Sequence, residues 1–203
     1  MTTQTAATHP LNRVAVYCGA ATPADPRWVE LAREVGDTLA RRGIGVVYGG
    51  GRRGLMGAVA DGALAAGGEV IGVIPDALAE AELAHTGVSQ LIQVQTMHER
   101  KACFTQLSDG FITLPGGVGT MDELWEAVSW SQLGYHALPV GLLNAYGYYD
   151  KLLEFAAHMT AAEFVRPQHA EIILAEATLE ALLARMAAHV PVMPLVKMPL
   201  DTI

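Results

Sequence analysis

The alternation of short apolar runs with helical stretches is the feature that most constrains how this chain can fold. The apolar runs are rich in Val and Ile, which is typical of buried strands. Between them, apolar residues recur at the spacing of a helix that buries one face. Neither an internal repeat nor a linker interrupts this order. The pattern predicts an α/β fold, namely a single doubly wound domain with a mostly parallel sheet.

The expected elements can be given by residue range. Strands are predicted at 13–18, 44–48, 69–75, 91–95, 109–114, 138–143 and 171–174. Helices are predicted at 28–42, 58–66, 97–108, 123–130, 149–160 and 178–189, with 76–89 either a short helix or an irregular loop. Thr96 and Thr178 are the predicted N-caps, and Glu99 completes a capping box with Thr96. We expect a flexible tail at 1–10, a Rossmann-like domain at 11–190 and a C-terminal tail at 191–203.

A glycine-rich turn, Leu114–Glu123, links a predicted strand to a predicted helix and reads Leu-Pro-Gly-Gly-Val-Gly-Thr-Met-Asp-Glu. Open α/β sheets bind ligands at such turns, where backbone N–H groups and the helix dipole favour an anion. Gly116, Gly117 and Gly119 permit positive φ and close approach of a phosphate. Thr120 either caps the helix or donates its hydroxyl to that phosphate. The turn therefore predicts a phosphate site.

Two charged residues stand out near this turn. Glu123 is expected in the first helical turn, where a carboxylate would repel a phosphate, so chemistry at a neighbouring atom is one explanation. The other is simple stabilisation of the helix start. Arg100 follows Thr96 closely, near a helix N-terminus that disfavours cations. It either binds phosphate or ribose, pairs with Glu123, or belongs to a solvated charged face.

A second strand–glycine–helix turn spans Gly49–Gly57. It is not the GxGxxG dinucleotide fingerprint, and it lacks a Walker lysine. Its small residues serve either helix–sheet packing or ligand contact. Two such turns at the same end of one sheet favour a shared site.

Composition excludes several classes of function. The 203 residues carry a net charge of −8, which argues against a nucleic-acid or membrane-surface binder. Cys18 and Cys103 form no CxxC pattern, which favours a reduced, cytoplasmic setting, and neither a signal peptide nor a membrane span is visible. Ala102 stands where an HExxH motif starting at His98 needs its second His, and no Cys/His cluster exists, so we expect no catalytic metal. We also expect no cofactor.

Three motifs in order resemble the Lonely Guy (LOG) family of cytokinin-activating phosphoribohydrolases. The family's PGGxGTxxE stands here as Pro115–Glu123, its GGGxxGLMG as Gly49–Gly57 and its MHxRK as Met97–Lys101. The similarity covers the chain from Val14 to about Val140. Such proteins have often been labelled lysine decarboxylases, but the residues give no support for decarboxylation.

The resemblance implies a nucleotide-binding, catalytic Rossmann-like domain that hydrolyses the N-glycosidic bond of N6-modified adenosine 5′-monophosphates. Free base and ribose 5-phosphate would be the products. It implies that Arg100 and Glu123 are the catalytic pair, with Arg100 lowering the pKa of Glu123 to keep it ionised. The substrate-binding residues that it implies are Gly50, Gly51, Glu82, Met97, Lys101, Gly116, Gly117, Val118, Gly119, Thr120 and Ser129.

Some departures and alternatives remain open at this point. Ala20 and Ala21 replace a common Ser-Ser pair, which removes hydroxyls from the first loop, whereas Ser129 keeps a hydroxyl where the family often has Thr. The resemblance also implies a homodimer. Alternative functions are a general nucleoside-monophosphate nucleosidase in salvage and a non-catalytic carrier of a phosphorylated ligand such as molybdenum cofactor.

Overall fold

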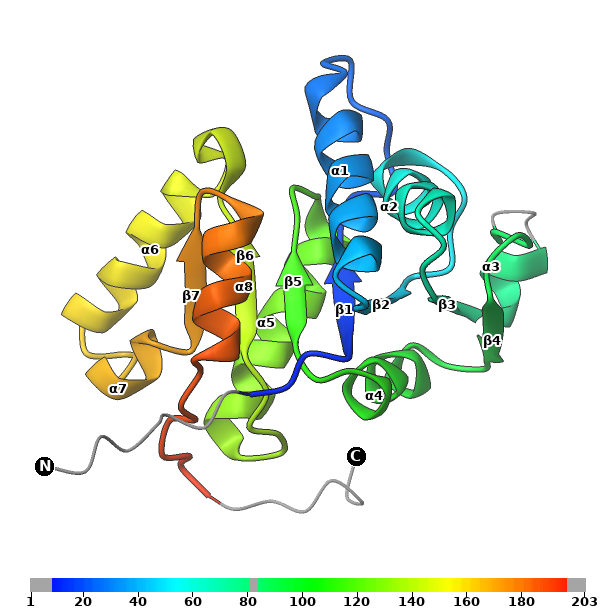
Figure 1. Cartoon of the computed structure of the whole chain (residues 1–203). Coiled ribbons are helices and arrows are strands. Elements are labelled where there is room, and N and C mark those ends of the chain that lie inside the picture. The colour runs from blue at the N-terminus through cyan, green and yellow to red at the C-terminus, as the bar shows by residue number, and fades with distance from the viewer. Residues whose placement is uncertain (1–8, 81–83, 197–203) are drawn as a thin grey trace, which may run out of the picture.

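The centre of the protein is one seven-stranded, entirely parallel sheet. The computed structural model describes residues 9–80 and 84–196 (Figure 1). The strand order across the sheet is β4-β3-β2-β1-β5-β6-β7. The strands are β1 (Arg13–Tyr17), β2 (Gly45–Tyr48), β3 (Val70–Pro75), β4 (Gln90–Val94), β5 (Phe111–Thr113), β6 (Val140–Leu143) and β7 (Ile173–Glu176). The prediction of a mostly parallel, doubly wound sheet is therefore confirmed, and the described sheet contains only parallel pairs.

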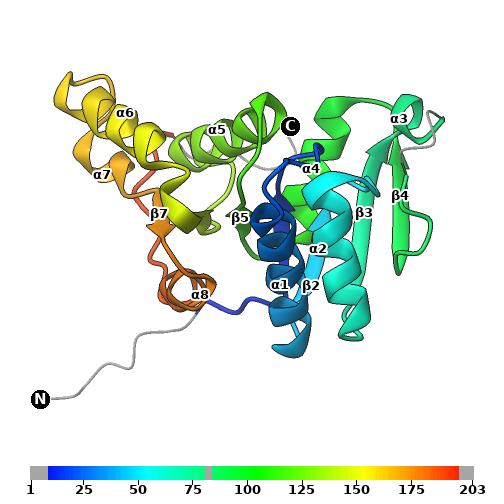
Figure 2. The ribbon, with the colours of Figure 1, turned by 90° about the horizontal axis from the view of Figure 1, so that it is seen from above.

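Helices cover both faces of the sheet, as the view from above shows (Figure 2). The helices α1, α2 and α8 lie on one face, and α4, α5 and α6 lie on the other. The described helices are α1 (Arg27–Arg41), α2 (Gly54–Ala65), α3 (Asp76–Glu80), α4 (Met97–Leu107), α5 (Val118–Leu133), the 3₁₀ turn η1 (Ala145–Gly147), α6 (Asp150–Ala161), α7 (Pro167–Ala170) and α8 (Leu179–Ala187).

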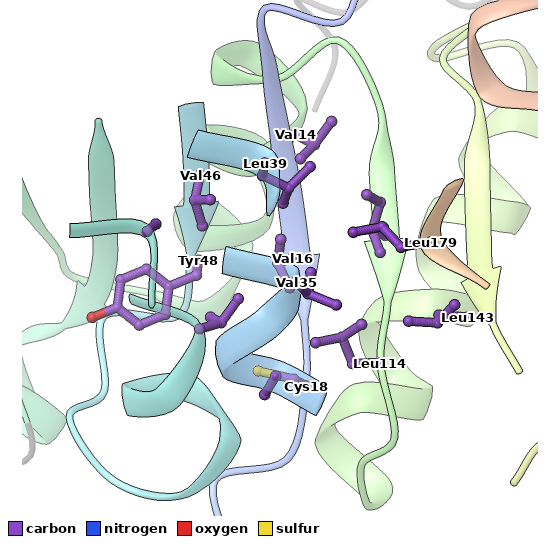
Figure 3. Packing of buried hydrophobic residues seen from close by; sticks show 14 of the residues in the cluster. Val14, Val16, Cys18, Val35, Leu39, Val46, Tyr48, Leu114, Leu143 and Leu179 are labelled. Carbon is purple, nitrogen blue, oxygen red and sulfur yellow. The ribbon is translucent and has the colours of Figure 1, made fainter. Parts of the chain in front are cut away.

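Each central strand is buried on both sides, which explains its nearly continuous apolar sequence. In β1, Val14 and Val16 point into a core shared with α1, α2 and α8 (Figure 3). Ala15 and Tyr17 point into a second core under α4 and α5. Alternate side chains of one strand thus anchor both helical layers.

Glycines have a packing role in α2, the helix that follows the second glycine turn, and in α1 beside it. A Cβ at Gly62 would collide with the carbonyl oxygen of Arg33, and a Cβ at Gly36 would collide with that of Val59. The backbones of α1 and α2 therefore touch, which only glycine permits at these two positions. The packing interpretation of these residues is supported.

The predicted caps are confirmed. Thr96 and Glu99 form a complete capping box at α4, and the Thr178 hydroxyl accepts a hydrogen bond from the N–H of Ala181 at α8. In contrast, α5 begins at Val118 rather than at 123. The short helix α7 was not predicted at all.

The strand order reverses between β1 and β5. From β1 the chain proceeds through β2 and β3 to β4 in one direction, and from β5 through β6 to β7 in the other. Such a reversal leaves a crevice at the carboxyl ends of the two strands, where ligands of this fold class bind. The Leu114–Glu123 turn follows β5 and lies at this place.

Candidate active site

Backbone hydrogen bonds join three loops at the carboxyl edge of the sheet. The N–H of Gly19, after β1, donates to the carbonyl of Pro115 over 3.1 Å. The carbonyl of Gly19 in turn accepts from the N–H of Leu55, at the start of α2, over 3.0 Å. The first loop thus binds to both glycine-rich turns, so the two turns share one site.

The turn after β5 leads directly into α5, with Gly117 as the N-cap residue. Thr120 is therefore the third residue of the helix and not its cap. Its buried hydroxyl lies so close to Gly116 that a Cβ there would collide with it. Among the described residues, Gly116, Gly117 and Gly119 all lack positive φ, which corrects that expectation. The turn needs Gly116 for close approach rather than for a left-handed backbone.

The N-terminus of α5 is open to solvent. No atom outside the immediate chain lies within 4 Å of where a Cβ would stand on Gly117 or Gly119, among the described residues. Val118 between them is 88% exposed. The first N–H groups of a helix have no partner within the helix. They are available here to an anion, and the phosphate expected at this turn stays a prediction.

A hollow of about 320 Å³ adjoins this turn. The loops that follow β1 and β5, the first turns of α1 and α2, and the β6–α6 connection line it. The lining residues are Gly19, Ala21, Pro23, Trp28, Leu55, Pro115, Gly116, Gly117 and Tyr148. It contains Ala21, where the family often has a hydroxyl, so this wall of the hollow is apolar.

Arg100 is fixed by the carbonyls of neighbouring strands. Its Nε donates to Val73 at 3.0 Å and its Nη2 donates to Gly49 at 2.9 Å. The guanidinium lies 5.5 Å from the ring centre of Phe104. The side chain is buried, with a residue exposure of 6%. Arg100 is therefore a rigid cation beside the second glycine turn, and the interpretation as a solvated charged face is wrong.

Glu123 faces this guanidinium from α5. Its Oε1 lies 3.7 Å from Nη1 of Arg100, which is longer than a direct hydrogen bond. Burial raises the pKa of Glu123 to about 7, and the opposing effect of Arg100 is smaller. Burial also lowers the pKa of Arg100. Arg100 does lower the pKa of Glu123, as expected, but the loss of hydration on burial outweighs this effect.

The position of Glu123 in its helix also differs from the expectation. Because α5 begins at Val118, Glu123 is in the second turn rather than the first. It is buried, with a residue exposure of 8%. A carboxyl with a pKa near 7 exchanges protons readily at neutral pH and stabilises positive charge when ionised. This arrangement is suited to chemistry rather than to stabilising a helix start.

Lys101 connects the two helices that carry this pair. Its Nζ lies 2.9 Å from a carboxylate oxygen of Asp122 and 2.9 Å from one of Glu126. Burial lowers its pKa, but the hydrogen bonds with Glu126 and Asp122 outweigh that effect and raise it. Lys101 thus links α4 to α5 through Asp122 and Glu126, the two acids that stand on either side of Glu123 in the sequence.

The other expected binding residues lie at different distances from the pair. Gly50 has a φ of 74°, and its carbonyl accepts from the N–H of His85 over 2.8 Å, while Gly51 bridges to Ala84. Met97 is exposed at the first position of α4. Ser129 lies in a groove between α5, α6 and α7, away from the glycine turns. Glu82 lies outside the described residues.

The tyrosines of the β6–α6 connection are the site residues that the sequence analysis missed. Tyr148 Oη donates to the carbonyl of Gly116 at 2.7 Å, and Tyr149 Oη donates to that of Leu114 at 2.7 Å. The only signal in the sequence is a pair of tyrosines after a predicted turn, and it does not indicate where the pair packs.

Within residues 9–80 and 84–196, no group of three His, Cys, Asp or Glu side chains is placed to hold a metal ion. None of the helices described there is long and apolar enough to cross a bilayer.

Fold and site together define a Rossmann-like α/β protein with a buried acid–guanidinium pair at the topological switch point. Residues 56–186 match the family model described as "Possible lysine decarboxylase". The chain belongs to the LOG family, the cytokinin riboside 5′-monophosphate phosphoribohydrolases. Its membership confirms the resemblance drawn from the three motifs.

Two curated relatives come from rice, Oryza sativa subsp. japonica. The probable cytokinin riboside 5′-monophosphate phosphoribohydrolase LOGL9 is 43% identical over 180 residues, which is 89% of this chain and 79% of the relative. The enzyme named LOG is 42% identical over 179 residues, covering 88% of this chain and 74% of that protein. Among solved structures, the molybdenum cofactor binding protein of Rippkaea orientalis superposes with a TM-score of 0.65 at 22% identity. The superposition covers 86% of this chain and 94% of the Rippkaea protein, so the two proteins share the fold.

Proposed function

We propose that this chain hydrolyses the N-glycosidic bond of N6-modified adenosine 5′-monophosphates, releasing the free base and ribose 5-phosphate. The observation that carries the proposal is the buried Arg100–Glu123 pair beside an open helix N-terminus. The names of the rice relatives specify the same reaction. A pure binding site has no need for a carboxyl whose pKa is raised to about 7 next to an anion-binding turn.

In this reaction the turn at 116–120 holds the 5′-phosphate through its backbone N–H groups and the Thr120 hydroxyl. As the bond from C1′ to the base nitrogen breaks, positive charge builds on the ribose ring. Ionised Glu123 stabilises that charge and orients a water molecule, as carboxylates do in glycosidases. Water oxygen adds to C1′, and the proton that Glu123 accepts from the water passes to the departing base. Arg100 holds Glu123 in place.

The other substrate contacts are proposed from the family resemblance. Gly50, Gly51 and Met97 flank Arg100 and would contact the nucleoside part. Glu82 and Ser129 are proposed contacts outside the turn, and Lys101 acts through its ion pairs with α5. The proposed substrate is a small nucleotide, so neither nucleic acid nor a membrane is a proposed partner.

The test compares base release from N6-isopentenyl-AMP, AMP and N6-isopentenyladenosine, followed by chromatography. We expect release from the monophosphates and at least a hundredfold loss of kcat in Glu123→Gln, since this removes a group acting in the transition state. Glu154→Gln is the matched control, because Glu154 is an exposed acid on α6 that pairs with Lys151. Undiminished turnover in Glu123→Gln would show that the assigned mechanism is wrong.

The same assay separates the alternative functions. Equal rates for AMP and N6-isopentenyl-AMP would indicate a general salvage nucleosidase. Tight binding of a phosphorylated ligand without any base release would favour the carrier alternative.

We further propose that the protein is a cytoplasmic homodimer. The supporting observation is the face formed by α5, α6 and α7. No residue of α6 is fully buried, and Phe155 and Phe164 are 55% and 85% exposed. An apolar groove lies beside them. Exposed aromatic side chains of this size are typical of protein–protein contacts.

A further inference from the structure

The connection between β6 and α6 is built to hold one tyrosine hydroxyl in a fixed place. Tyr146 and Gly147 both adopt left-handed backbone conformations, with φ of 57° and 71°. The side chain of Asn144 accepts from the N–H of Tyr149 at 2.7 Å and donates to Asp150 at 2.8 Å. A left-handed tyrosine costs conformational free energy, which the surrounding contacts must offset. The turn is therefore held in a specific conformation, beyond what joining two elements requires.

Aromatic contacts fix the ring of Tyr148 although it is 45% exposed. Its centre lies 5.4 Å from that of Trp28 and 4.8 Å from that of Tyr149, both in edge-to-face arrangements. The hydroxyl then reaches the carbonyl of Gly116 at 2.7 Å. The bond spans from one side of the hollow to the turn that opens α5.

This bond determines the direction of one N–H group. In a trans peptide the C=O and the N–H point in opposite directions, and the carbonyl of Gly116 shares its peptide unit with the N–H of Gly117. Glycine stands on both sides of this unit, so the unit can rotate more freely than any other in the turn. With the carbonyl bound to Tyr148, the Gly117 N–H points away from Tyr148.

We propose that Tyr148 is a positioning residue that orients the Gly117 N–H toward the 5′-phosphate of the substrate. The inference rests on the proposed function for the identity of the ligand. Gly117 is the N-cap residue of α5, so its N–H joins the free N–H groups of the first helical turn. Without the Tyr148 hydroxyl, the Gly116–Gly117 peptide samples both orientations and the phosphate loses one preorganised donor.

Tyr149 provides an internal contrast. Its hydroxyl also binds a carbonyl of this turn, that of Leu114. The peptide unit concerned contains the nitrogen of Pro115, which has no N–H to orient. Tyr149 is buried, with 3% exposure. Its hydrogen bond therefore contributes to stability and orients no N–H group toward the phosphate.

The experiment measures kcat, KM and thermal unfolding for Tyr148→Phe, Tyr149→Phe and Tyr146→Phe. Tyr146→Phe removes the hydroxyl of a largely exposed tyrosine in the same turn and is the matched control. We expect Tyr148→Phe to raise KM for N6-isopentenyl-AMP about three- to tenfold, the worth of one neutral hydrogen bond, with kcat within twofold of wild type. Tyr149→Phe should lower Tm without a comparable rise in KM.

The affinity for ribose 5-phosphate, measured by calorimetry, should fall by the same factor in Tyr148→Phe, while the affinity for adenosine stays unchanged. An unchanged KM and ribose 5-phosphate affinity would overturn the inference, and so would an equal KM rise in Tyr149→Phe. If the wild-type protein binds ribose 5-phosphate but releases no base, the proposed function fails. The ribose 5-phosphate affinities of the variants then still decide the role of Tyr148.

Discussion

At the scale of single residues, burial determines the behaviour of the catalytic candidates more than their mutual attraction does. Arg100 and Glu123 lie 3.7 Å apart, yet the pKa of each is shifted in the direction that favours the neutral form of the side chain. Desolvation of a buried ion pair commonly exceeds its Coulombic gain. The ionised pair therefore costs folding free energy, which other contacts of the fold must offset.

The first consequence concerns the pH dependence of turnover. If Glu123 must be ionised to stabilise the ribose cation, kcat should rise with pH and level off above a pKa of about 7. Saturating substrate is needed, because the second pKa of the substrate phosphate lies nearby, at about 6. A profile measured from pH 5 to 9 that is flat, or that falls across neutrality, would contradict the role of Glu123.

The second consequence concerns stability. The pKa of Glu123 is raised from 4.5 to about 7 on folding, so the native state retains a proton that the unfolded state releases in this window. The stabilisation is complete below pH 4.5 and is lost as pH rises through 7. Relative to Glu123→Gln, wild-type protein should lose up to about 3 kcal/mol of unfolding free energy between these limits. Urea titrations at pH 5 and pH 8 test this, and parallel losses in both proteins would refute it.

At the scale of elements, periodicity located every strand and most helices, because strand and helix periods depend on local sequence. The start of α5 was misplaced because Val118 and Gly119 have low helix propensity, which tertiary packing overrides. From the sequence alone, pairing with Glu123 was one of several roles that stayed open for Arg100. Tyr148 could not be assigned, since its contact with Gly116 arises only when the β6–α6 connection folds over the β5–α5 turn.

The contact between α4 and α5 should depend on Lys101. Lys101→Met leaves two carboxylates without their shared cation, and we expect a loss of about 1–3 kcal/mol of unfolding free energy and a lower kcat. Lys151→Met is the matched control, because Lys151 pairs with Glu154 at the surface and is 87% exposed. Denaturant unfolding of both variants measures the difference. Equal effects would show that the ion pairs of Lys101 contribute no more to stability than the surface pair of Lys151.

At the scale of the whole molecule, the proposed dimer predicts that a surface mutation can lower the mass of the assembly from that of a dimer to that of a monomer. Placing charge on the exposed aromatic face with Phe155→Glu should convert a dimer into a monomer, since a buried unpaired carboxylate opposes association. Sedimentation velocity measures this directly. Leu78→Glu, at an exposed apolar residue on α3, is the control. A monomeric wild-type protein, or a dimer that tolerates Phe155→Glu, would place the interface elsewhere.

The central position of β1 has a consequence for biosynthesis. Tyr17 pairs with Thr113 of β5, which leaves the ribosome long after β1 to β4. A nascent chain that ends before Phe111 already contains Arg100 but has one open edge of β1 and lacks the Leu114–Glu123 turn. The active site is consequently assembled late, and a prematurely terminated chain is expected to be an inactive and aggregation-prone half-sheet.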